Sequence, residues 1–362
     1  MRIQSLIAGE VAAEPDAIRA TVRESRADAR AAADALRDRG VRRVFVIGNG
    51  TSYHSSLAVA LVHRRHARPD DPPVLALTAG EFRHYAPAVD GRDAIIGISA
   101  SGEFRDVVSI AEAYRDRLPV VAVVHVPGSS LTRLTDHVVV SAGGPSAVPV
   151  MTKTFAATLT AALLIVAELF DDDRGEMLVD DLLVAADAGD AAIRAAEGVV
   201  PGLAARLADA QHLYVVGSGG GHVAALEAAL KLKETALVHA EGSESWETAS
   251  GAATLIGPAA TVIALAPPGP GREAVVDVAR HCIDWGARVI EVGPVAAVDG
   301  AELLEIAPTA NEDLASLDTT PSVALLADAL ARARGLDPDH PAWTERYRSQ
   351  GLTHVIGSAA VE

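Results

Sequence analysis

Two short turns carry the residue types that could bind an anion. They read GNGTSYH and SASGEF, and their candidate residues are Gly50, Thr51, Ser52, Ser99 and Ser101. Each turn follows a β-branched apolar run and precedes a helical pattern, so each is predicted to lie where a strand ends and a helix begins. Free N–H groups and the helix dipole attract negative charge there, and glycine with hydroxyls completes a cradle for phosphate.

A helical pattern further along the chain carries a carboxylate and a cation. We predict one continuous helix over residues 222–241, with Glu227, Lys231, Glu234 and Val238 on one face. Proton transfer between C1 and C2 of an open-chain sugar needs a carboxylate base and a cation that stabilises charge on oxygen. Glu234 and Lys231 could supply these groups, although composition alone favours an ordinary surface pair.

The elements that would position these residues occur twice. Residues 44–61 and 214–230 each read as strand, glycine turn and helix, and they align without a gap. A second block at residues 95–113 repeats at residues 262–280. The paired turn glycines of the first block are Gly48 with Gly217 and Gly50 with Gly219. Such self-similarity indicates a duplicated domain.

The repeat also tests the meaning of the hydroxyls. Serine and threonine are favoured helix N-caps, so one hydroxyl-rich turn alone would be explained better by capping. Two such turns on adjacent strands favour a binding site. The second half keeps the fold pattern but fills the hydroxyl positions with Gly220, Gly221, Ala266 and Pro268. We therefore predict one anion site, in the first half of the chain.

The other elements follow a strand–helix rhythm. An Ala-rich helix is predicted over residues 15–39. Further strands are predicted at residues 74–77, 120–125, 137–141, 288–292 and 303–306. Alternating strands and helices of this length predict an α/β fold with parallel sheets covered on both faces.

Composition limits the partners. The chain has 362 residues, 49% of them apolar, which suits two domains, and its formal net charge is −17. This charge argues against a broad nucleic-acid or membrane surface, because both need excess Lys and Arg. A small anion can still bind through local N–H groups and hydroxyls.

The single cysteine and the longest apolar run both predict buried helices. Cys282 lies in the apolar-periodic stretch 275–285, so we expect a buried, inert thiol. A single cysteine allows no intrachain disulfide and no thiolate metal cluster, and we expect neither a metal site nor a cofactor. Residues 155–170 contain Thr158, Thr160 and Glu168 and are fewer than the ~20 residues that span a membrane. The first residues lack a signal-peptide core, and we expect a cytoplasmic protein.

A dinucleotide site is the weaker alternative. GSGGGH resembles part of G-x-G-x-x-G, but His222 takes the place of the last glycine. No acidic residue closes a following strand about 20 residues on, as that motif requires.

At these motifs the chain resembles the SIS-domain family of sugar-phosphate isomerases. It is most similar to the isomerase half of glucosamine-6-phosphate synthase and its deaminase and deglycase relatives. The resemblance runs from about residue 41 to the end of the chain. Its four motifs are GTSYH at 50–54, SASGE at 99–103, TKTF at 152–155, and ALKLKE at 229–234 followed by HAE at 239–241.

The resemblance implies roles and an architecture. Ser52, Ser99 and Ser101, with Thr51, would hold a phosphate, and Glu234 would be the enolisation base beside Lys231. The fold would be two SIS domains, each a five-stranded parallel sheet flanked by helices, Rossmann- or flavodoxin-like. We expect a homodimer. The predicted segments are an N-terminal helix at 1–40, the first domain at 41–175, a connecting helix at 176–200, the second domain at 201–340, and a tail at 341–362 over the active site.

Several positions depart from the family pattern. Ala100 replaces a glutamine, and Phe104 replaces a threonine. The family's E-x-x-H-G-P histidine, linked to opening the sugar ring, is Ser250 here. Ser250 therefore becomes a candidate substrate-binding residue only, and His354 in the tail becomes a candidate for the missing imidazole. The chain also shows no N-terminal cysteine or glutaminase segment, so glutamine-dependent amination is not expected.

These observations predict an enzyme that isomerises an anionic sugar, a hexose or aminohexose 6-phosphate, through an enediol. Three alternatives stay open. They are deamination or deglycation of an amino-sugar phosphate, isomerisation of a sulfosugar in which sulfonate replaces phosphate, and non-catalytic sensing of a sugar phosphate.

Overall fold

Two parallel sheets organise the chain, and each belongs to its own unit. The computed structural model describes residues 5–307 and 311–350. Unit 1 comprises Met1–Pro15 and Val184–Pro341, and unit 2 comprises Asp16–Leu183 and Ala342–Glu362. The predicted fold class is confirmed, because each unit holds a five-stranded parallel sheet flanked by helices.

The sheet of unit 2 has the strand order β2-β1-β3-β4-β5, and every neighbouring pair is parallel. Its strands are β1 (Arg43–Gly48), β2 (Val74–Thr78), β3 (Asp93–Ile98), β4 (Val120–Val124) and β5 (His137–Val140). The central strands β1, β3 and β4 are almost entirely buried, as near-continuous runs of valine and isoleucine require.

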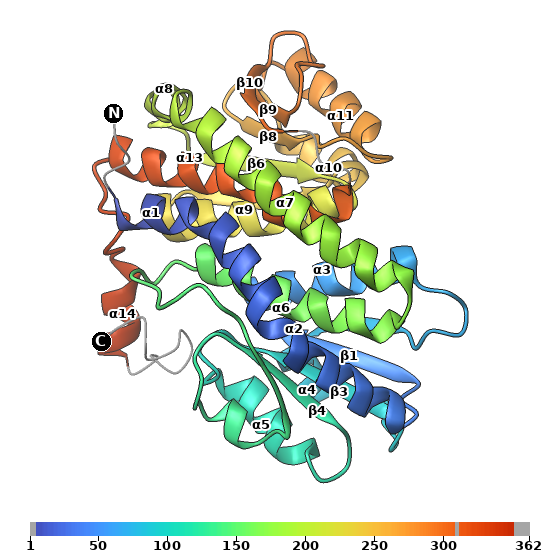
Figure 1. Ribbon diagram of the computed structural model, residues 1–362. Coiled ribbons are helices and arrows are strands. Elements are labelled where there is room, and N and C mark those ends of the chain that lie inside the picture. Colours follow the sequence, from blue (N-terminus) through green and yellow to red (C-terminus); the bar gives the residue numbers. More distant parts are fainter. Residues whose placement is uncertain (1–4, 308–310, 351–362) are drawn as a thin grey trace. The chain divides into compact units, whose positions relative to one another are not determined.

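Helices cover both faces of this sheet (Figure 1). The helices α3 and α6 pack on one face, and α4 and α5 pack on the other. Their bounds are α3 (Thr51–His66), α4 (Ala79–Tyr85), α5 (Arg105–Tyr114) and α6 (Lys153–Phe170). Unit 2 also contains most of α2 (Glu14–Asp38), the first part of α7 (Asp173–Glu197), η1 (Leu131–Arg133) and α14 (Trp343–Ser349).

The helix α6 is long and apolar enough to cross a membrane by length and composition alone, but all of its residues are buried inside the structure. It packs on α3 and on the strands β4 and β5. The prediction of a buried helix over residues 155–170 is therefore confirmed.

The sheet of unit 1 has the strand order β10-β9-β8-β6-β7, and all of its pairs are parallel. Read from its other edge, as β7-β6-β8-β9-β10, it has the same order as the sheet of unit 2. Its strands are β6 (His212–Gly217), β7 (His239–Glu244), β8 (Thr261–Leu265), β9 (Arg288–Gly293) and β10 (Glu302–Glu305). The correspondence of β1 with β6 and of β3 with β8 confirms the predicted duplication.

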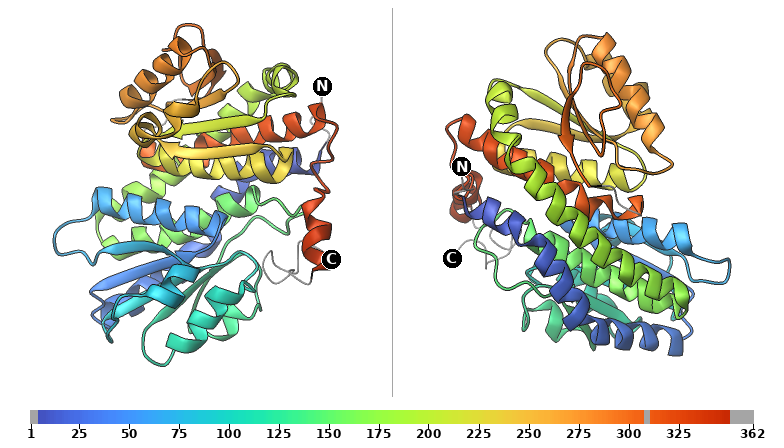
Figure 2. Two further views of the ribbon diagram at one scale, coloured as in Figure 1. Left: turned by 180° about the vertical axis from the view of Figure 1, so that it is seen from behind. Right: turned by 45° about the horizontal axis from the view of Figure 1, so that its top comes forward.

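The helices of unit 1 also cover both faces of their sheet (Figure 2). The helix α9 lies on one face with α13 packed against it, while α10 and α11 lie on the other face. Their bounds are α9 (Gly220–Ala236), α10 (Ser245–Ser250), α11 (Arg272–Asp284) and α13 (Thr320–Ala333). Further elements are α1 (Leu6–Ala12), α8 (Val200–Leu207), η2 (Ala252–Leu255), η3 (Glu312–Leu314) and α12 (Ala315–Asp318).

The prediction of one continuous helix over residues 222–241 is wrong. The helix α9 ends at Ala236, Leu237 takes a left-handed conformation with φ 50°, and β7 follows. Val238 is buried but lies outside the helix. Glycine usually occupies a left-handed position at a helix end, and leucine rarely does. Because leucine stands at this position, the sequence did not mark where the helix ends. The strand is possible because Gly242 lies against the backbone of α9, where an added Cβ would be 2.6 Å from the Ala225 oxygen.

Two further details concern helices. The N-terminal region contains two helices, α1 and α2, where the sequence predicted one helix from residue 15. Cys282 is buried in α11, as predicted, and burial raises the pKa of its thiol to about 11. Such a thiol is almost fully protonated at neutral pH and is a poor nucleophile.

The turn from β1 to α3 depends on a glycine that permits a close approach. A Cβ at Gly48 would lie 2.6 Å from the carbonyl carbon of Ser52, in the first turn of α3. The equivalent Gly217 would collide with the Gly221 carbonyl in α9. The next turn glycines adopt almost the same conformation, with φ 54° and ψ −128° at Gly50 and φ 55° and ψ −125° at Gly219.

We expect Gly48→Ala to destabilise the protein by about 1–3 kcal/mol, because the added methyl group meets backbone that cannot rotate away. Gly80→Ala is the matched control in the same unit, since Gly80 lies in α4 with nothing within 4 Å of an added Cβ. That control should stabilise α4 by roughly 0.5–1 kcal/mol. Thermal unfolding of both variants measures this, and equal midpoints would contradict the argument.

Candidate functional site

The first hydroxyl pair lies inside the opening turn of α3. The N-cap position is Gly50, so Thr51 and Ser52 are the first two helical residues and neither occupies the cap. Both side chains are buried, and the first turn of α3 carries no acidic residue. The turn therefore presents the positive end of the helix dipole without a nearby carboxylate on its own helix.

The second pair lies in the loop between β3 and α5. The sequence placed Ser99 and Ser101 at a helix start, but α5 begins only at Arg105. The Ser99 Oγ accepts a hydrogen bond from the Gly102 N–H, and the Ser101 Oγ accepts one from the Glu103 N–H, both at 3.2 Å. A hydroxyl that accepts still has its proton to donate. These bonds therefore shape the loop while leaving both hydroxyl protons available for an anion.

Both pairs belong to one edge of one sheet. The strands β1 and β3 are direct neighbours and parallel, so the turns that follow them lie at the same carboxyl edge. We call Thr51, Ser52, Ser99 and Ser101 the hydroxyl cradle. The sequence predicted this arrangement from the two motifs, and the sheet order places their strands side by side.

Other motif residues have structural partners. The Glu103 Oε1 accepts from the Ser130 N–H at 2.8 Å and so fixes the loop after β4. The Phe104 ring packs against the core of unit 2. The Lys153 Nζ, which is buried, donates to the Pro145 carbonyl at 2.9 Å. These three side chains hold the loops around the cradle.

Sequence reasoning missed Ser129 as a fifth hydroxyl of this region. Its buried Oγ has no hydrogen-bond partner among residues 5–307 and 311–350. It packs so close to Gly102, whose φ is 66°, that any side chain at 102 would collide with it. The sequence indicated the turn that contains Gly102, but it gave no sign that the loop after β4, which carries Ser129, packs against that turn.

The corresponding place in unit 1 is filled by the chain itself. The Glu312 carboxylate lies beside the turn glycines, and its Oε1 would be 3.6 Å from a Cβ at Gly219. A side chain at Gly269 would collide with the same carboxylate, and one at Gly220 would collide with the Glu312 backbone. In this copy of the turn, a carboxylate of the chain itself lies against the turn glycines.

A buried ionic cluster lies on α9 in unit 1. The Lys231 Nζ lies 2.7 Å from the Glu234 Oε2 and 3.1 Å from the Glu227 Oε1. Lys231 is only 1% exposed and Glu227 is fully buried, whereas the Glu234 side chain is 28% exposed. An ordinary surface pair is thereby excluded, and Glu234 is the member of the cluster that solvent or a ligand can reach.

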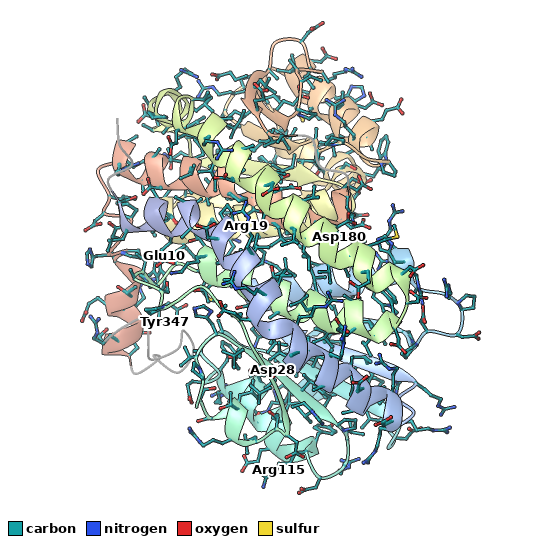
Figure 3. All side chains as sticks on the ribbon, in the orientation of Figure 1. Glu10, Arg19, Asp28, Arg115, Asp180 and Tyr347 are labelled. Atoms are coloured by element: carbon teal, nitrogen blue, oxygen red, sulfur yellow. The ribbon has the colours of Figure 1, made fainter. Side chains whose placement is uncertain are left out.

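Two acidic residues of the N-terminal region complete this cluster, and the sequence analysis did not identify them. Glu10 on α1 (Figure 3) and Glu14 at the start of α2 are both buried, and Glu14 interacts electrostatically with Lys231, Glu227 and Glu10. A usable signal existed, because Glu14 falls on the apolar stripe of Ile7, Val11 and Ile18. We call Glu10, Glu14, Glu227, Lys231 and Glu234 the Lys231 cluster.

Burial and neighbouring charges set opposite pKa shifts in this cluster. Burial would lower the pKa of Lys231, but Glu227 and Glu234 outweigh it and the pKa is raised. Burial raises the pKa of Glu14 well above its usual range; Lys231 acts against this, while Glu227 and Glu10 add to it. Lys231 is therefore a permanent cation at neutral pH, and Glu14 favours its protonated form.

The remaining candidates fall outside both groups. Ser250 is exposed at the end of α10. His354 lies outside the described residues. His239 and Glu241 are exposed on β7, in a strand rather than the predicted helix. Within the described part of the chain, no group of three or more His, Cys, Asp or Glu residues is arranged to hold a metal ion.

Comparison with known proteins gives a consistent match over both units. The family model described as SIS domain matches residues 39–167 and 206–332. Among curated proteins, the glutamine–fructose-6-phosphate aminotransferase (isomerizing) of Methanothermobacter thermautotrophicus is 32% identical over 306 residues, which is 83% of this chain and 50% of that protein. The protein of the same name from Aeropyrum pernix is 35% identical over 317 residues, with the same coverage. The chain thus spans about half the length of these relatives.

Solved structures show the same fold. The C-terminal domain of glucosamine-fructose-6-phosphate aminotransferase from Francisella tularensis superposes with a TM-score of 0.85 at 21% identity, covering 94% of this chain and 99% of that one. The tagatose-6-phosphate ketose/aldose isomerase of Escherichia coli gives a TM-score of 0.80 at 17% identity, covering 94% and 97%.

The raised pKa of Glu14 predicts how stability depends on pH. The folded protein binds this proton more tightly than the unfolded chain does, so the contribution of Glu14 to stability decreases as pH rises above the unfolded pKa. We expect Glu14→Gln to be more stable than the wild type at pH 8, and this gain should shrink towards pH 4.

Thermal unfolding across this pH range measures the effect. The control is Glu24→Gln, which removes an exposed carboxylate of α2. Its stability difference from the wild type should stay within about 0.5 kcal/mol. A Glu14→Gln gain that does not change with pH would contradict the assignment.

Proposed function

Because the chain belongs to the SIS domain family, as its motifs predicted, we propose that it isomerises an anionic sugar between its aldose and ketose forms. The substrate class is a hexose or aminohexose 6-phosphate. The word "isomerizing" in the name of the curated relatives supports this reaction, and the chain matches about half of their length. The hydroxyl cradle binds the anionic group, and Glu234 with Lys231 carries out the proton transfer.

The observation that carries the proposal is the contact between Lys231 and Glu234. A buried ammonium 2.7 Å from a partly exposed carboxylate holds that carboxylate in one orientation and keeps a positive charge beside it. Lys231 keeps its charge before the substrate binds, since Glu227 and Glu234 raise its pKa. This is the preorganised electrostatic environment that stabilises a developing oxyanion.

The reaction then follows a balanced proton transfer. Glu234 takes the proton from C2 of the open-chain aldose, and negative charge develops on O1, where Lys231 stabilises it. The proton of the C2 hydroxyl passes to O1, and Glu234 returns its proton to C1. The product is the ketose, with no net gain or loss of protons.

The departures from the family pattern affect ring opening and the anion. Ser250 cannot donate a proton as imidazole does. We therefore propose that the substrate binds in its open-chain form or that its ring opens without catalysis. Ala100 and Phe104 provide no hydrogen-bonding side chains, which keeps sulfonate open as the anionic group. An amino group at C2 would allow deamination or deglycation through the same enolised intermediate. A sensor would bind the sugar without exchanging its C2 hydrogen.

We expect Glu234→Gln to lower the rate of C2 hydrogen exchange about 10²–10⁴-fold, because the variant keeps the shape of the side chain but loses the base. Proton NMR in deuterated water, with a panel of hexose, aminohexose and sulfohexose anions, measures this exchange. Glu241→Gln is the control, since Glu241 is an exposed carboxylate on β7. It should change the rate less than twofold. If the wild type binds a sugar from this panel without exchanging its hydrogen, the chain is a sensor.

We expect Ser101→Ala to raise KM roughly tenfold or more with little change in kcat, since a hydrogen bond to a charged group contributes about 1.5–3 kcal/mol. Inorganic phosphate should become a weaker competitive inhibitor by a similar factor. Ser109→Ala is the matched control, because its hydroxyl bonds to the Asp106 carbonyl within α5. Unchanged KM and inhibition in Ser101→Ala would remove this residue from the anion site.

A further inference from the structure

Two histidines lie beside each other at the start of β6 and β7 in unit 1. His212 and His239 are the first residues of these strands, and they are register partners in the parallel sheet. Side chains of register partners point to the same face of a sheet. Both residues are exposed. His239 also opens the HAE motif, to which the proposed function gives no role.

The pair lies on the face of the sheet opposite α9. Side chains alternate along a strand, and on β7 Ala240 is buried while Gly242 lies against the α9 backbone. His239 therefore points to the other face, as do its partner His212 and Tyr214, which belongs to the core beside α11. The sheet thus separates the histidine pair from the Lys231 cluster on α9.

The spacing of the two rings suits a shared metal ion better than a hydrogen bond. The Nδ1 atoms are 3.5 Å apart, which is longer than the ~3 Å typical of a hydrogen bond from an N–H group. Two nitrogens bonded at about 2.0–2.1 Å to one tetrahedral zinc ion lie roughly 3.3–3.4 Å apart. Neighbouring ligands of an octahedral or square-planar ion would lie about 3.0 Å apart. The pair is therefore spaced like two ligands of a tetrahedral ion.

The two rings can turn toward such an ion. Within residues 5–307 and 311–350, neither imidazole makes a side-chain hydrogen bond or ring contact except to the other. Rotation of a histidine ring about its Cβ–Cγ bond has a broad energy minimum, so both lone pairs can be directed to one point at small cost. Neutral imidazole is a preferred ligand of zinc, whereas Mg²⁺ and Ca²⁺ prefer oxygen.

An ion at this place would hold an edge strand. The strand β7 pairs only with β6 and forms one edge of its sheet. It also follows Leu237, whose left-handed backbone is unfavourable for a leucine. One metal bond from each strand would keep the first residue of β7 beside the first residue of β6.

We propose that His212 and His239 bind one zinc ion through their Nδ1 atoms, with water completing a tetrahedral coordination, and that this ion links β7 to β6. In the described part of the chain no group of three or more His, Cys, Asp or Glu residues is arranged to hold a metal. The affinity therefore comes from two imidazoles, and the ion exchanges with the solution. The expectation of no metal site rested on the single cysteine, and no sequence spacing marks a pair that two strands bring together.

Calorimetry of the full chain with Zn²⁺ tests the site. The wild type should bind one ion at the pair. Either His212→Ala or His239→Ala should raise Kd about tenfold or more, because the second ligand no longer acts at high effective concentration. The double variant should bind little more weakly than either single variant, since both belong to one chelate. Mg²⁺ should not bind to the pair.

His84→Ala is the matched control, because His84 is an exposed histidine of α4 whose ring neighbour is Tyr85. It should change Kd less than twofold. If each single variant lowers the number of bound ions without changing Kd, the histidines bind separately and the proposal is wrong. A double variant that binds Zn²⁺ as the wild type does would also overturn it.

Thermal unfolding tests the link between the strands. Zn²⁺ should raise the unfolding midpoint of the wild type and of His84→Ala, and it should not raise that of the double variant. If the alanine variants do not fold, His212→Gln and His239→Gln keep a polar side chain on each strand and repeat both measurements. A wild-type midpoint that Zn²⁺ leaves unchanged would contradict the link. The outcome is independent of the proposed function, because the pair and the Lys231 cluster lie on opposite faces of the sheet.

Discussion

A helix that begins directly on the end of a strand is the constraint on which both sheets depend. The first turns of α3 and α9 lie so close to β1 and β6 that only glycine fits at residues 48 and 217. Because residues 50 and 219 share one unusual conformation, the two helix N-termini present their N–H groups in the same way. The backbone therefore creates two equivalent positive ends, and the side chains decide what each of them binds.

The two units place different groups at the positive ends of α3 and α9. In unit 1 the Glu312 carboxylate lies beside Gly219 and Gly269, and the absence of a side chain at Gly220 leaves room for the η3 backbone. In unit 2 the equivalent turns carry hydroxyls, and α3 has no acidic residue in its first turn. A carboxylate supplied by the chain is permanent, whereas hydroxyls leave the place open for an exchangeable anion. The duplicated fold thus carries hydroxyls at this turn in unit 2 and a carboxylate of the chain itself in unit 1.

The elements that occur in both halves of the chain could be predicted from the sequence, whereas several features that do not repeat could not. The repeated strands, the glycine turns and the hydroxyl pairs followed from self-similarity and from the valine- and isoleucine-rich runs, whereas the strand order came only from the structure. The end of α9 could not be predicted, because Leu237 takes a conformation that glycine normally marks. The Lys231 cluster was found only in part. Its i, i+3 and i+4 members share a helix, but Glu10 and Glu14 join them through tertiary packing, which local patterns do not encode.

Burial changes what the Lys231 cluster can do. A Glu–Lys pair in water contributes little, because solvent screens both charges and the side chains lose entropy when they are held together. Inside unit 1, Glu227 and Glu234 contact the Lys231 ammonium, and the buried Glu14 interacts electrostatically with Lys231, Glu227 and Glu10. Ionising all of these carboxyl groups would leave excess negative charge away from water. Protonation of Glu14 relieves this excess without removing the partners that keep Lys231 charged. The cluster thereby keeps a cation beside Glu234, the member whose side chain is 28% exposed and which a ligand can reach.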